Sequence, residues 1–440
     1  MKGASSKLLL LLLLCISISC SDDVSTEQID QQSDIEDIEN LYKELLESPN
    51  EFTSTDAVKR NPKKLYVHYM PWFHSKEYDG YWGQHWTMTN KNPDNFDELG
   101  NREIAAHYYP LIGPYSSQDP DLQKYHLLLM KLSGIDGVIF DWYGSRDIND
   151  YLSIKENTES FIEEIEEVGL EFAIMYEDRV AEYTMARVPD AKNRTAAGME
   201  AVINDIKYIE NTYFTSENYI RHNGAEMLFV FGPHFMVTSE QWNEVFSSIN
   251  SNPEVFSLWK ASDRVGKMSG GEFSWVDKNH METLTDYYNY ARENGLTTIG
   301  GVYPGFDDFY VEGGWREPGE NDWRIPHNNG ETLSETLNLM DTEPVEFIQL
   351  ITWNDFGEGT MLEPTREFGF NYLKELQAYT GVGFSEETLK LPYQLYQLKK
   401  KYKSHRRLNR VLDGVYKFVF KLRTKKANRL LKLIQRRFPV

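Results

Sequence analysis

The chain has 440 residues, of which 46 are Lys or Arg and 68 are Asp or Glu, so its formal net charge is −22. A balance this acidic argues against nucleic acid as a partner, because phosphate groups would be repelled. The two cysteines, Cys15 and Cys20, both lie near the N-terminus, which excludes a disulfide or a catalytic thiol from the rest of the chain.

The N-terminal segment resembles the signal peptide of a bacterial lipoprotein. Its apolar run from Leu8 to Ile18 is too short to span a bilayer but has the length of a signal-peptide core. Small residues lead to Cys20, as in a lipobox, and the following SDD resembles the export signal of surface lipoproteins in Bacteroidota. We expect a signal peptide over residues 1–19, acylation of Cys20, for example with palmitate, and attachment to the outer membrane at its surface or periplasmic face. An ordinary secretory signal cleaved nearby is the alternative.

The next two segments are an acidic tether and a long domain. Residues 20–60 are polar and acidic and predict a tether with one helix near Ile35–Leu46. From residue 61 to 380, short runs of β-branched and aromatic residues alternate with helical patterns. The predicted strands are Leu65–Tyr69, Gly137–Trp142, Phe172–Tyr176, Met227–Phe231, Phe256–Lys260, Phe273–Val276, Thr298–Val302 and Phe347–Thr352. The predicted helices are Leu122–Lys131, Glu159–Glu167, Met199–Asn211, Ser239–Ser248, Met281–Glu293 and Thr332–Met340.

This alternation predicts an α/β fold, a closed parallel (β/α)8 TIM barrel. The weakest part of the pattern is SDRVGKMSGG, between the fifth and sixth strands, which offers no good helix. A doubly wound open sheet is the competing fold, but no glycine-rich phosphate loop follows the first strand.

The segment after the first predicted strand, YMPWFHSKEYDGYWGQHW, is rich in aromatic residues. Catalytic groups of a TIM barrel lie just after the C-terminal ends of its strands, so this loop would face the site. Indole rings can stack on sugar rings, and we expect Trp72, His85 and Trp86 to bind carbohydrate; a loop packed on itself is the alternative. Because His68, His74 and His85 match no compact ligand spacing, we expect no metal ion, and no cofactor is expected either.

Polar and aromatic side chains also occur where three other predicted strands end. Asp141 and Trp142 end the second strand, while Glu177 and Tyr303 follow the third and seventh strands. Their position predicts contact with a substrate. A structural salt bridge is the alternative, which Arg179 beside Glu177 keeps open.

The eighth predicted strand leads into TWNDFGEGT, which holds two acids three residues apart, Asp355 and Glu358. Glycines flank Glu358 on both sides, so a tight turn can direct both acids into one pocket. Cleavage of a glycosidic bond needs one carboxylic acid to protonate the leaving oxygen and one carboxylate to assist attack. The pair is therefore predicted to be catalytic, and Asn354 beside it to bind the substrate.

Taken together, these segments resemble glycoside hydrolase family 99 and its family 71/99-like relatives. The resemblance is carried by YMPWF with QHW, HYYPLIGPYSSQDP, GIDGVIFDWYG, YPGFDD and TWNDFGEGTMLEP, which occur in this order from Tyr66 to Pro364. It implies a retaining endo-α-mannosidase on a (β/α)8 barrel that acts through a 1,2-anhydro sugar. It further implies that Asp355 is the base for the substrate's 2-hydroxyl, that Glu358 is the acid/base, and that Glu177 belongs to the substrate site.

The chain departs from the family pattern at the pair itself. Characterised members carry Glu, Trp and His where this chain has Asp355, Phe356 and Gly357. The shorter side chain moves the base by about 1.5 Å, and a shift of that size can cost about 10²-fold in rate. The related fungal α-1,3-glucanases of family 71 carry a Trp-Asn-Asp segment. An α-glucan substrate, an inverting mechanism and a non-catalytic surface glycan-binding lipoprotein therefore stay open as alternatives.

The C-terminal segment, residues 381–440, is predicted to be a basic helical tail. From Lys399 onward it has 16 Lys or Arg and one acid, Asp413, a charge of +15, which leaves about −37 on the residues before it. Apolar residues occur among the cations at helical spacing: Leu408, Val411, Leu412, Val415, Phe418 and Val419. The tail is either a helix packed on the barrel or a basic amphipathic helix on an anionic membrane. The protein is expected to be a monomer whose partners are a polysaccharide or oligosaccharide and the anchoring membrane.

Overall fold

A computed structural model describes residues 26–49, 58–320 and 323–440. Its centre is a closed ring of eight parallel strands. The ring closes because β3 pairs with β5 and β9 pairs with β1, all in parallel. In ring order the strands are β1 (Lys64–Tyr69), β2 (Gly137–Trp142), β3 (Glu171–Tyr176), β5 (Ala225–Val230), β6 (Glu254–Leu258), β7 (Ser269–Phe273), β8 (Thr298–Val302) and β9 (Phe347–Leu350). The two-residue strand β4 (Arg221–His222) pairs with β5 in the antiparallel direction and is not part of the ring. The predicted (β/α)8 barrel is confirmed.

Helices and short turns connect the strands around the ring. They are α2 (Lys76–Asp79), α3 (Gln84–Thr87), α4 (Pro120–Leu132), α5 (Tyr151–Val168), α6 (Arg179–Arg187), η1 (Ala191–Asn193), α7 (Arg194–Thr212), α8 (Ser239–Phe246), η2 (Ser262–Met268), α9 (Met281–Glu293), η3 (Asn328–Gly330), α10 (Glu331–Thr342) and α11 (Asn371–Thr380). Local sequence explains where several begin. Asp119 accepts a hydrogen bond from the Asp121 amide just before Pro120 opens α4, and Thr238 and Gln241 form a capping box at α8.

The sixth barrel strand differs from its prediction at Phe273–Val276. It runs from Ser269 to Phe273, directly after the 3₁₀ helix η2. Gly270 and Gly271 occupy its first half, so no alternating apolar side chains mark it in the sequence. A Cβ at Gly271 would lie 2.2 Å from the carbonyl oxygen of Thr297, just before β8, so the close approach of this backbone requires a glycine. The same glycine removes the side-chain pattern by which a strand is predicted.

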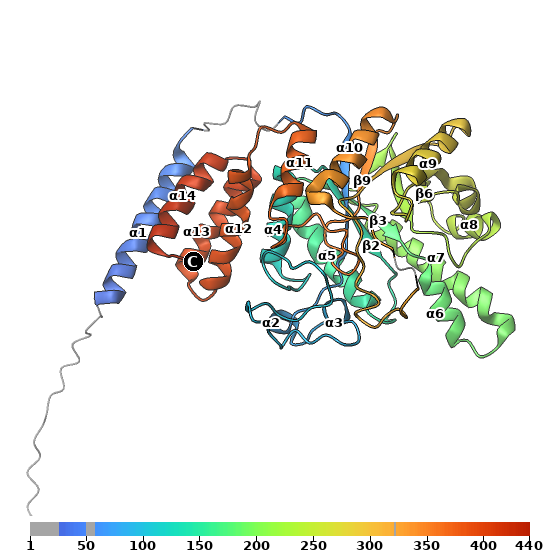
Figure 1. Ribbon diagram of the computed structural model, residues 1–440, viewed down its shortest axis with the longest axis horizontal. Helices are drawn as coiled ribbons and strands as arrows, with labels where there is room; N and C mark the ends of the chain where they lie inside the picture. The colour runs from blue at the N-terminus through green and yellow to red at the C-terminus, as the bar shows by residue number, and fades with distance from the viewer. Residues whose placement is uncertain (1–25, 50–57, 321–322) are drawn as a thin grey trace, which may run out of the picture.

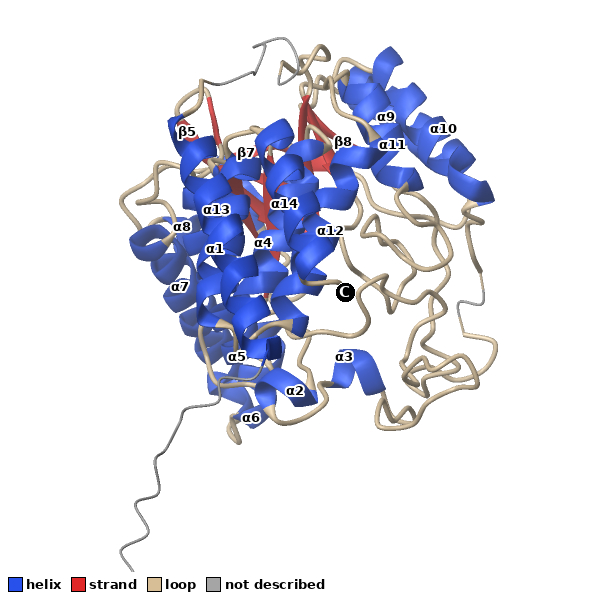
Figure 2. Ribbon diagram, turned by 90° about the vertical axis from the view of Figure 1, so that its left-hand side faces the viewer, coloured by secondary structure: helices blue, strands red, loops and turns tan. Residues whose placement is uncertain are grey.

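A second group of helices lies beside the barrel: α1 (Thr26–Glu47), α12 (Glu386–Lys401), α13 (Arg406–Phe420) and α14 (Thr424–Arg437). Figures 1 and 2 show α1 lying along α13 and α14, with α12 next to α4 of the barrel. Part of the segment predicted as a tether is therefore a helix that packs, since its Ile35, Ile38 and Leu45 are buried. The predicted signal peptide and Cys20 lie outside the described residues.

The basic tail buries its apolar face against other helices. All six apolar residues that mark its helical spacing are buried. Of the two interpretations of the tail, the structure thus supports the packed helix, because the apolar stripe is already covered. Within residues 26–49, 58–320 and 323–440, no helix is both long and apolar enough to cross a membrane.

Candidate active site

The segment after β9 is held to the end of β1 by one asparagine. The Asn354 side chain accepts a hydrogen bond from the Met70 amide at 2.9 Å and donates to the Met70 carbonyl at 3.0 Å. One residue further on, the Asp355 amide donates to the Thr352 hydroxyl at 2.8 Å. These contacts fix residues 352–355 at the C-terminal mouth of the barrel, where the catalytic groups of such barrels lie.

The segment after β8 holds the same turn from the other side. The amide of Asp307 donates to the carbonyl of Glu358 at 2.9 Å, and the amide of Phe309 donates to the carbonyl of Gly357 at 2.8 Å. Gly359 has φ +67°, and a Cβ there would lie 2.8 Å from the Asp307 carbonyl oxygen. The turn that carries Glu358 is therefore a backbone-paired unit of two loops.

Asp355 and Glu358 come together at this mouth. Asp355 is 3% exposed, and its Oδ1 accepts a hydrogen bond from the amide of Glu358 at 2.9 Å. Glu358 is half-buried, and its Oε1 accepts a hydrogen bond from the Tyr310 hydroxyl at 3.0 Å. The structure thus brings the two predicted acids into one site.

Burial shifts both carboxyl groups toward neutral pH. It raises the pKa of Asp355 to about 7, against the opposing effect of the Glu358 and Gly357 amides. Burial and then the charge of Asp355 raise the pKa of Glu358 to about 8, while the Tyr310 hydroxyl opposes the rise. Near pH 7.5 the pair therefore holds about one proton, with Glu358 the group that favours keeping it.

A second pair of acids, Asp141 and Glu177, lies at the ends of β2 and β3. Both side chains are buried, and Arg179 donates from Nε to Glu177 Oε2 at 2.6 Å. Burial raises the pKa of Asp141 well above its usual value, and the charges of Glu177 and Asp355 raise it further. Glu177 thus forms the salt bridge with Arg179 that was the alternative to substrate contact. The charge of Asp355 acts on Asp141, so the two acid pairs interact electrostatically.

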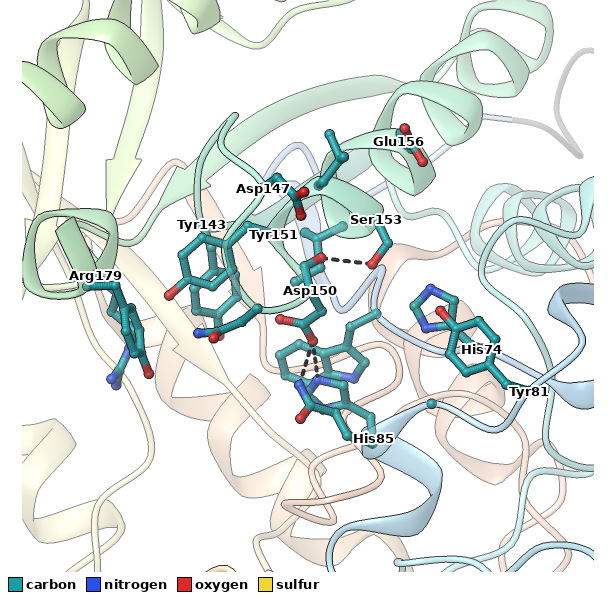
Figure 3. Close-up of a pocket in the computed structure, with 17 residues that line it drawn as sticks. His74, Tyr81, His85, Tyr143, Asp147, Asp150, Tyr151, Ser153, Glu156 and Arg179 are labelled. Carbon is teal, nitrogen blue, oxygen red and sulfur yellow. Dashed lines mark hydrogen bonds and ion pairs between the residues drawn. The ribbon is translucent and has the colours of Figure 1, made fainter. Parts of the chain in front are cut away.

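A cavity of about 830 Å³, a volume typical of small-molecule sites, is lined by Arg179, the residue that binds Glu177 (Figure 3). Trp72 and His85 stack on its wall with ring centroids 4.0 Å apart, and His85 Nε2 lies 3.1 Å from Asp150 Oδ2. Tyr143 and Arg179, neighbours of the second acid pair, also line it.

A row of aromatic rings joins this cavity to Glu358. The ring of Tyr310, which donates to Glu358, lies 5.8 Å from Trp315, and Trp315 lies edge-on to His85 at 5.7 Å. Such rings offer faces for stacking and edges for hydrogen bonding. The arrangement suits an extended ligand that reaches from the cavity to the acid pair.

Comparison with known proteins adds to this geometry. The family model described as Glycosyl hydrolase family 99 matches residues 61–255. These residues, less than half of the chain, are similar to that family. The matched residues end before Asp355 and Glu358, so the roles of these two acids rest on the site and not on the match.

Individual proteins to which the chain is similar are distant in sequence. A glycoprotein endo-alpha-1,2-mannosidase-like protein of Mus musculus is 23% identical over 285 residues, 59% of this chain and 58% of its own length. A glycoprotein endo-alpha-1,2-mannosidase of Xenopus laevis is 23% identical over 341 residues, 68% and 69% of the two chains. The chain thus spans less than two thirds of the mouse relative.

The solved structure of the family 99 endo-alpha-mannosidase from Bacteroides thetaiotaomicron is 18% identical, with a TM-score of 0.56 over 73% of this chain and 97% of that one. At this identity the likeness concerns the fold.

Four predicted contacts of the candidate site need correction. Trp86 and Trp142 are fully buried, and Trp86 packs on Phe73 and donates its Nε1 to the Tyr115 carbonyl. Tyr303 is also fully buried; its hydroxyl contacts His280 Nδ1 at 2.9 Å. These three rings belong to the core, because their strand and loop positions turn them away from the mouth.

Asn354 is the fourth correction. It is fully buried, and both ends of its amide are hydrogen-bonded to Met70, so it positions the turn and does not contact a ligand. In contrast, Trp72 and His85 line the cavity, as does Arg179, which binds Glu177. Substrate contact by Trp72, His85, Asp141 and Glu177 stays a prediction.

Two residues that lower the pKa of Glu358, Tyr310 and Arg316, are not among the residues predicted from the sequence. Tyr310 donates to Glu358, and Arg316, which pairs with Asp308 at 2.6 Å, lowers its pKa. Tyr143, beside Asp141, was also missed as a lining residue. A signal existed for Tyr310, because it follows the acids of YPGFDD in a loop already predicted to face the mouth.

Proposed function

We propose that this protein is a glycoside hydrolase that cleaves α-glycosidic bonds of a polysaccharide or oligosaccharide, with Asp355 and Glu358 as its catalytic residues. The observation that carries the proposal is the pair itself: two acids on one backbone-paired turn, with pKa values raised to about 7 and about 8. One group can then act as a base while the other donates a proton near neutral pH.

The different pKa values of the two acids support different roles in the reaction. Asp355, with the lower pKa, accepts the proton of the substrate's 2-hydroxyl, whose oxygen attacks the anomeric carbon and forms a 1,2-anhydro sugar. Glu358 donates its proton to the departing glycosidic oxygen. The Glu358 carboxylate then takes a proton from the water that opens the anhydro ring, and Asp355 returns its proton to O2, so both acids regain their starting states.

An α-mannoside is the substrate that this route fits best. In an α-mannoside the 2-hydroxyl and the leaving group lie trans to one another, as ring closure requires. The names of the mouse and frog relatives, which describe endo-α-1,2-mannosidases or a similar protein, support the same substrate class.

A second candidate is inversion by direct attack of water. Asp355 stands where characterised family members carry the longer glutamate, which leaves room for a water molecule between the carboxylate and the sugar. In that route Asp355 takes the proton of the water, and no anhydro sugar forms.

Replacing either acid tests the proposal. We expect Glu358→Gln and Asp355→Asn each to lower kcat on α-mannan by about 10²–10⁴-fold, while affinity for the oligosaccharide product changes little. Glu317→Gln, which alters an exposed acid of the loop after β8, is the matched control and should keep wild-type activity. Proton NMR of the first-formed anomer distinguishes retention from inversion. Near wild-type turnover by either acid variant would overturn the assignment.

A further inference from the structure

A second cleft lies between the barrel and helix α12. It has a volume of about 600 Å³ and shares no lining residue with the cavity lined by Trp72 and His85. One wall comes from barrel loops that include Tyr78 and residues 111–116, and the other from Tyr393, Tyr396 and Gln397 of α12. We call it the α12 cleft.

One face of α12 supplies its wall because of helical spacing. Tyr396 and Gln397 follow Tyr393 by three and four residues and precede Lys400 by four and three, so all four lie on the same side of the helix. Lys400 forms an ion pair with Asp119, the residue that caps α4, and Lys399 lies 3.6 Å from Asp121. The two walls are therefore fixed to each other before any ligand arrives.

The lining combines ring faces with hydrogen-bonding groups. Tyr78 is 44% exposed and Tyr393 is half-buried, which leaves aromatic surface open to the cleft. Gln397 donates to the Tyr393 hydroxyl at 2.7 Å, and the exposed cations Arg366 and Lys401 stand at the rim. Sugars bind to this combination, since their C–H faces stack on aromatic rings and their hydroxyls bond to amides and guanidinium groups.

From this we propose that the α12 cleft is a second carbohydrate-binding site, which holds a segment of the polysaccharide away from the acid pair. The proposal rests on the proposed function for the identity of the polymer. It gives the basic tail a role in the reaction, because α12 supplies half of the cleft. Binding there raises the local concentration of polymer at the active site without contacting the reacting bond.

Electrophoresis of the full-length protein in native gels containing α-mannan, α-1,3-glucan or alginate tests the cleft. We expect at least one polymer to retard the wild type, and Tyr78→Ala/Tyr393→Ala to lose most of that retardation. Gln397→Trp, which fills the cleft, should do the same. Tyr290→Ala is the matched control, since Tyr290 is 38% exposed on α9 and does not line the cleft.

Kinetics supply an independent readout. For the polymer that is cleaved, KM should rise about five- to tenfold in the cleft variants with kcat unchanged, whereas cleavage of a tetrasaccharide of the same linkage should be unaffected. Circular dichroism confirms that each variant is folded.

The outcomes separate the two proposals. The proposed binding site would be refuted if both cleft variants showed the same retardation and KM as the wild type. It would also be refuted if none of the three polymers retarded the wild type. If no polymer is cleaved but retardation depends on Tyr78 and Tyr393, the cleft stands and the proposed function fails.

Discussion

The two acids of the active site differ in what surrounds them. Asp355 is stabilised as an anion by backbone amides, whereas Glu358 receives a single side-chain hydrogen bond, from Tyr310. In the proposed mechanism Asp355 acts ionised, so activity is expected to fall as the pH drops through about 7. Glu358 acts protonated in that mechanism, so activity is expected to fall as the pH rises through about 8. The pH profile of kcat/KM should therefore be a narrow bell whose two limbs belong to the coupled pair.

Tyr310→Phe tests how Glu358 is tuned. The Tyr310 hydrogen bond lowers the pKa of Glu358, so its loss should raise that pKa and move the alkaline limb of the profile to higher pH by about one unit. The measurement is kcat/KM from pH 5 to 10. Tyr303→Phe removes a buried hydroxyl that contacts His280 instead, and its profile should match the wild type. An alkaline limb that stays in place in Tyr310→Phe would show that the hydroxyl does not tune Glu358.

At the scale of elements, the site is made by two loops that pair through their backbones. The segment after β8 and the segment after β9 exchange hydrogen bonds at residues 307–309 and 357–358, and Asn354 ties the second segment to β1. Below this turn, Glu363 accepts a hydrogen bond from Tyr115 at 2.6 Å, and Tyr115 in turn is bonded to Asn354. The position of Glu358 is thus determined by three strand ends at once.

Gly359→Ala should disturb this pairing. The positive φ costs about 1–2 kcal/mol for any other residue, and the new Cβ would also clash with Asp307. We expect kcat/KM to fall by about 10²-fold, because displacement of Glu358 by about 1 Å is enough for such a loss. The matched control is Gly369→Ala, where φ is +54° and no atom lies within 4 Å of the Cβ. It should lose similar stability in thermal unfolding but keep its activity; equal activity in both variants would contradict the role given to the pairing.

At the scale of the whole molecule, helix α1 and the C-terminal helices α12, α13 and α14 form one helical unit against the barrel. The acidic helix α1 and the basic tail are complementary in charge: Arg407 binds Glu39 through two nitrogens at 3.0 and 2.7 Å, and Arg437 lies 3.0 Å from Asp34. Lys426, which is 6% exposed, donates to the carbonyls of Leu45 and Ser48 at the end of α1. The excess positive charge of the tail is thus partly matched within the chain.

Lys426→Met should loosen α1 specifically. It removes both hydrogen bonds of the ammonium group; the Leu45 carbonyl keeps its bond from the Ser48 hydroxyl, whereas the Ser48 carbonyl loses the Lys426 donor. Loss of such bonds costs about 1–3 kcal/mol. Hydrogen exchange measured by mass spectrometry should show faster exchange in α1 and unchanged exchange in β1 and β9. Lys425→Met, a change at the exposed neighbouring position, is the control. Exchange in α1 as slow as in the control would contradict the docking role of Lys426.

The sequence by itself determined the barrel and the acid pair. Strand and helix periods are local, so seven of the eight ring strands could be placed closely; the glycine-rich start of β7 carries no such period. Asp355 and Glu358 could be predicted because both acids and their flanking glycines lie within one short segment after a strand.

Only the tertiary structure decided which side chains reach the site. Whether Trp86, Trp142 and Tyr303 face the mouth or the core depends on packing against elements far away in the chain, which no local pattern encodes. The packing of α1 is likewise decided by distant residues, because its Glu39 binds Arg407, which lies 368 positions away in the sequence. The composition predicted an acidic tether and a basic tail separately, but their pairing, and the cleft that the tail forms with the barrel, arise from long-range contacts alone.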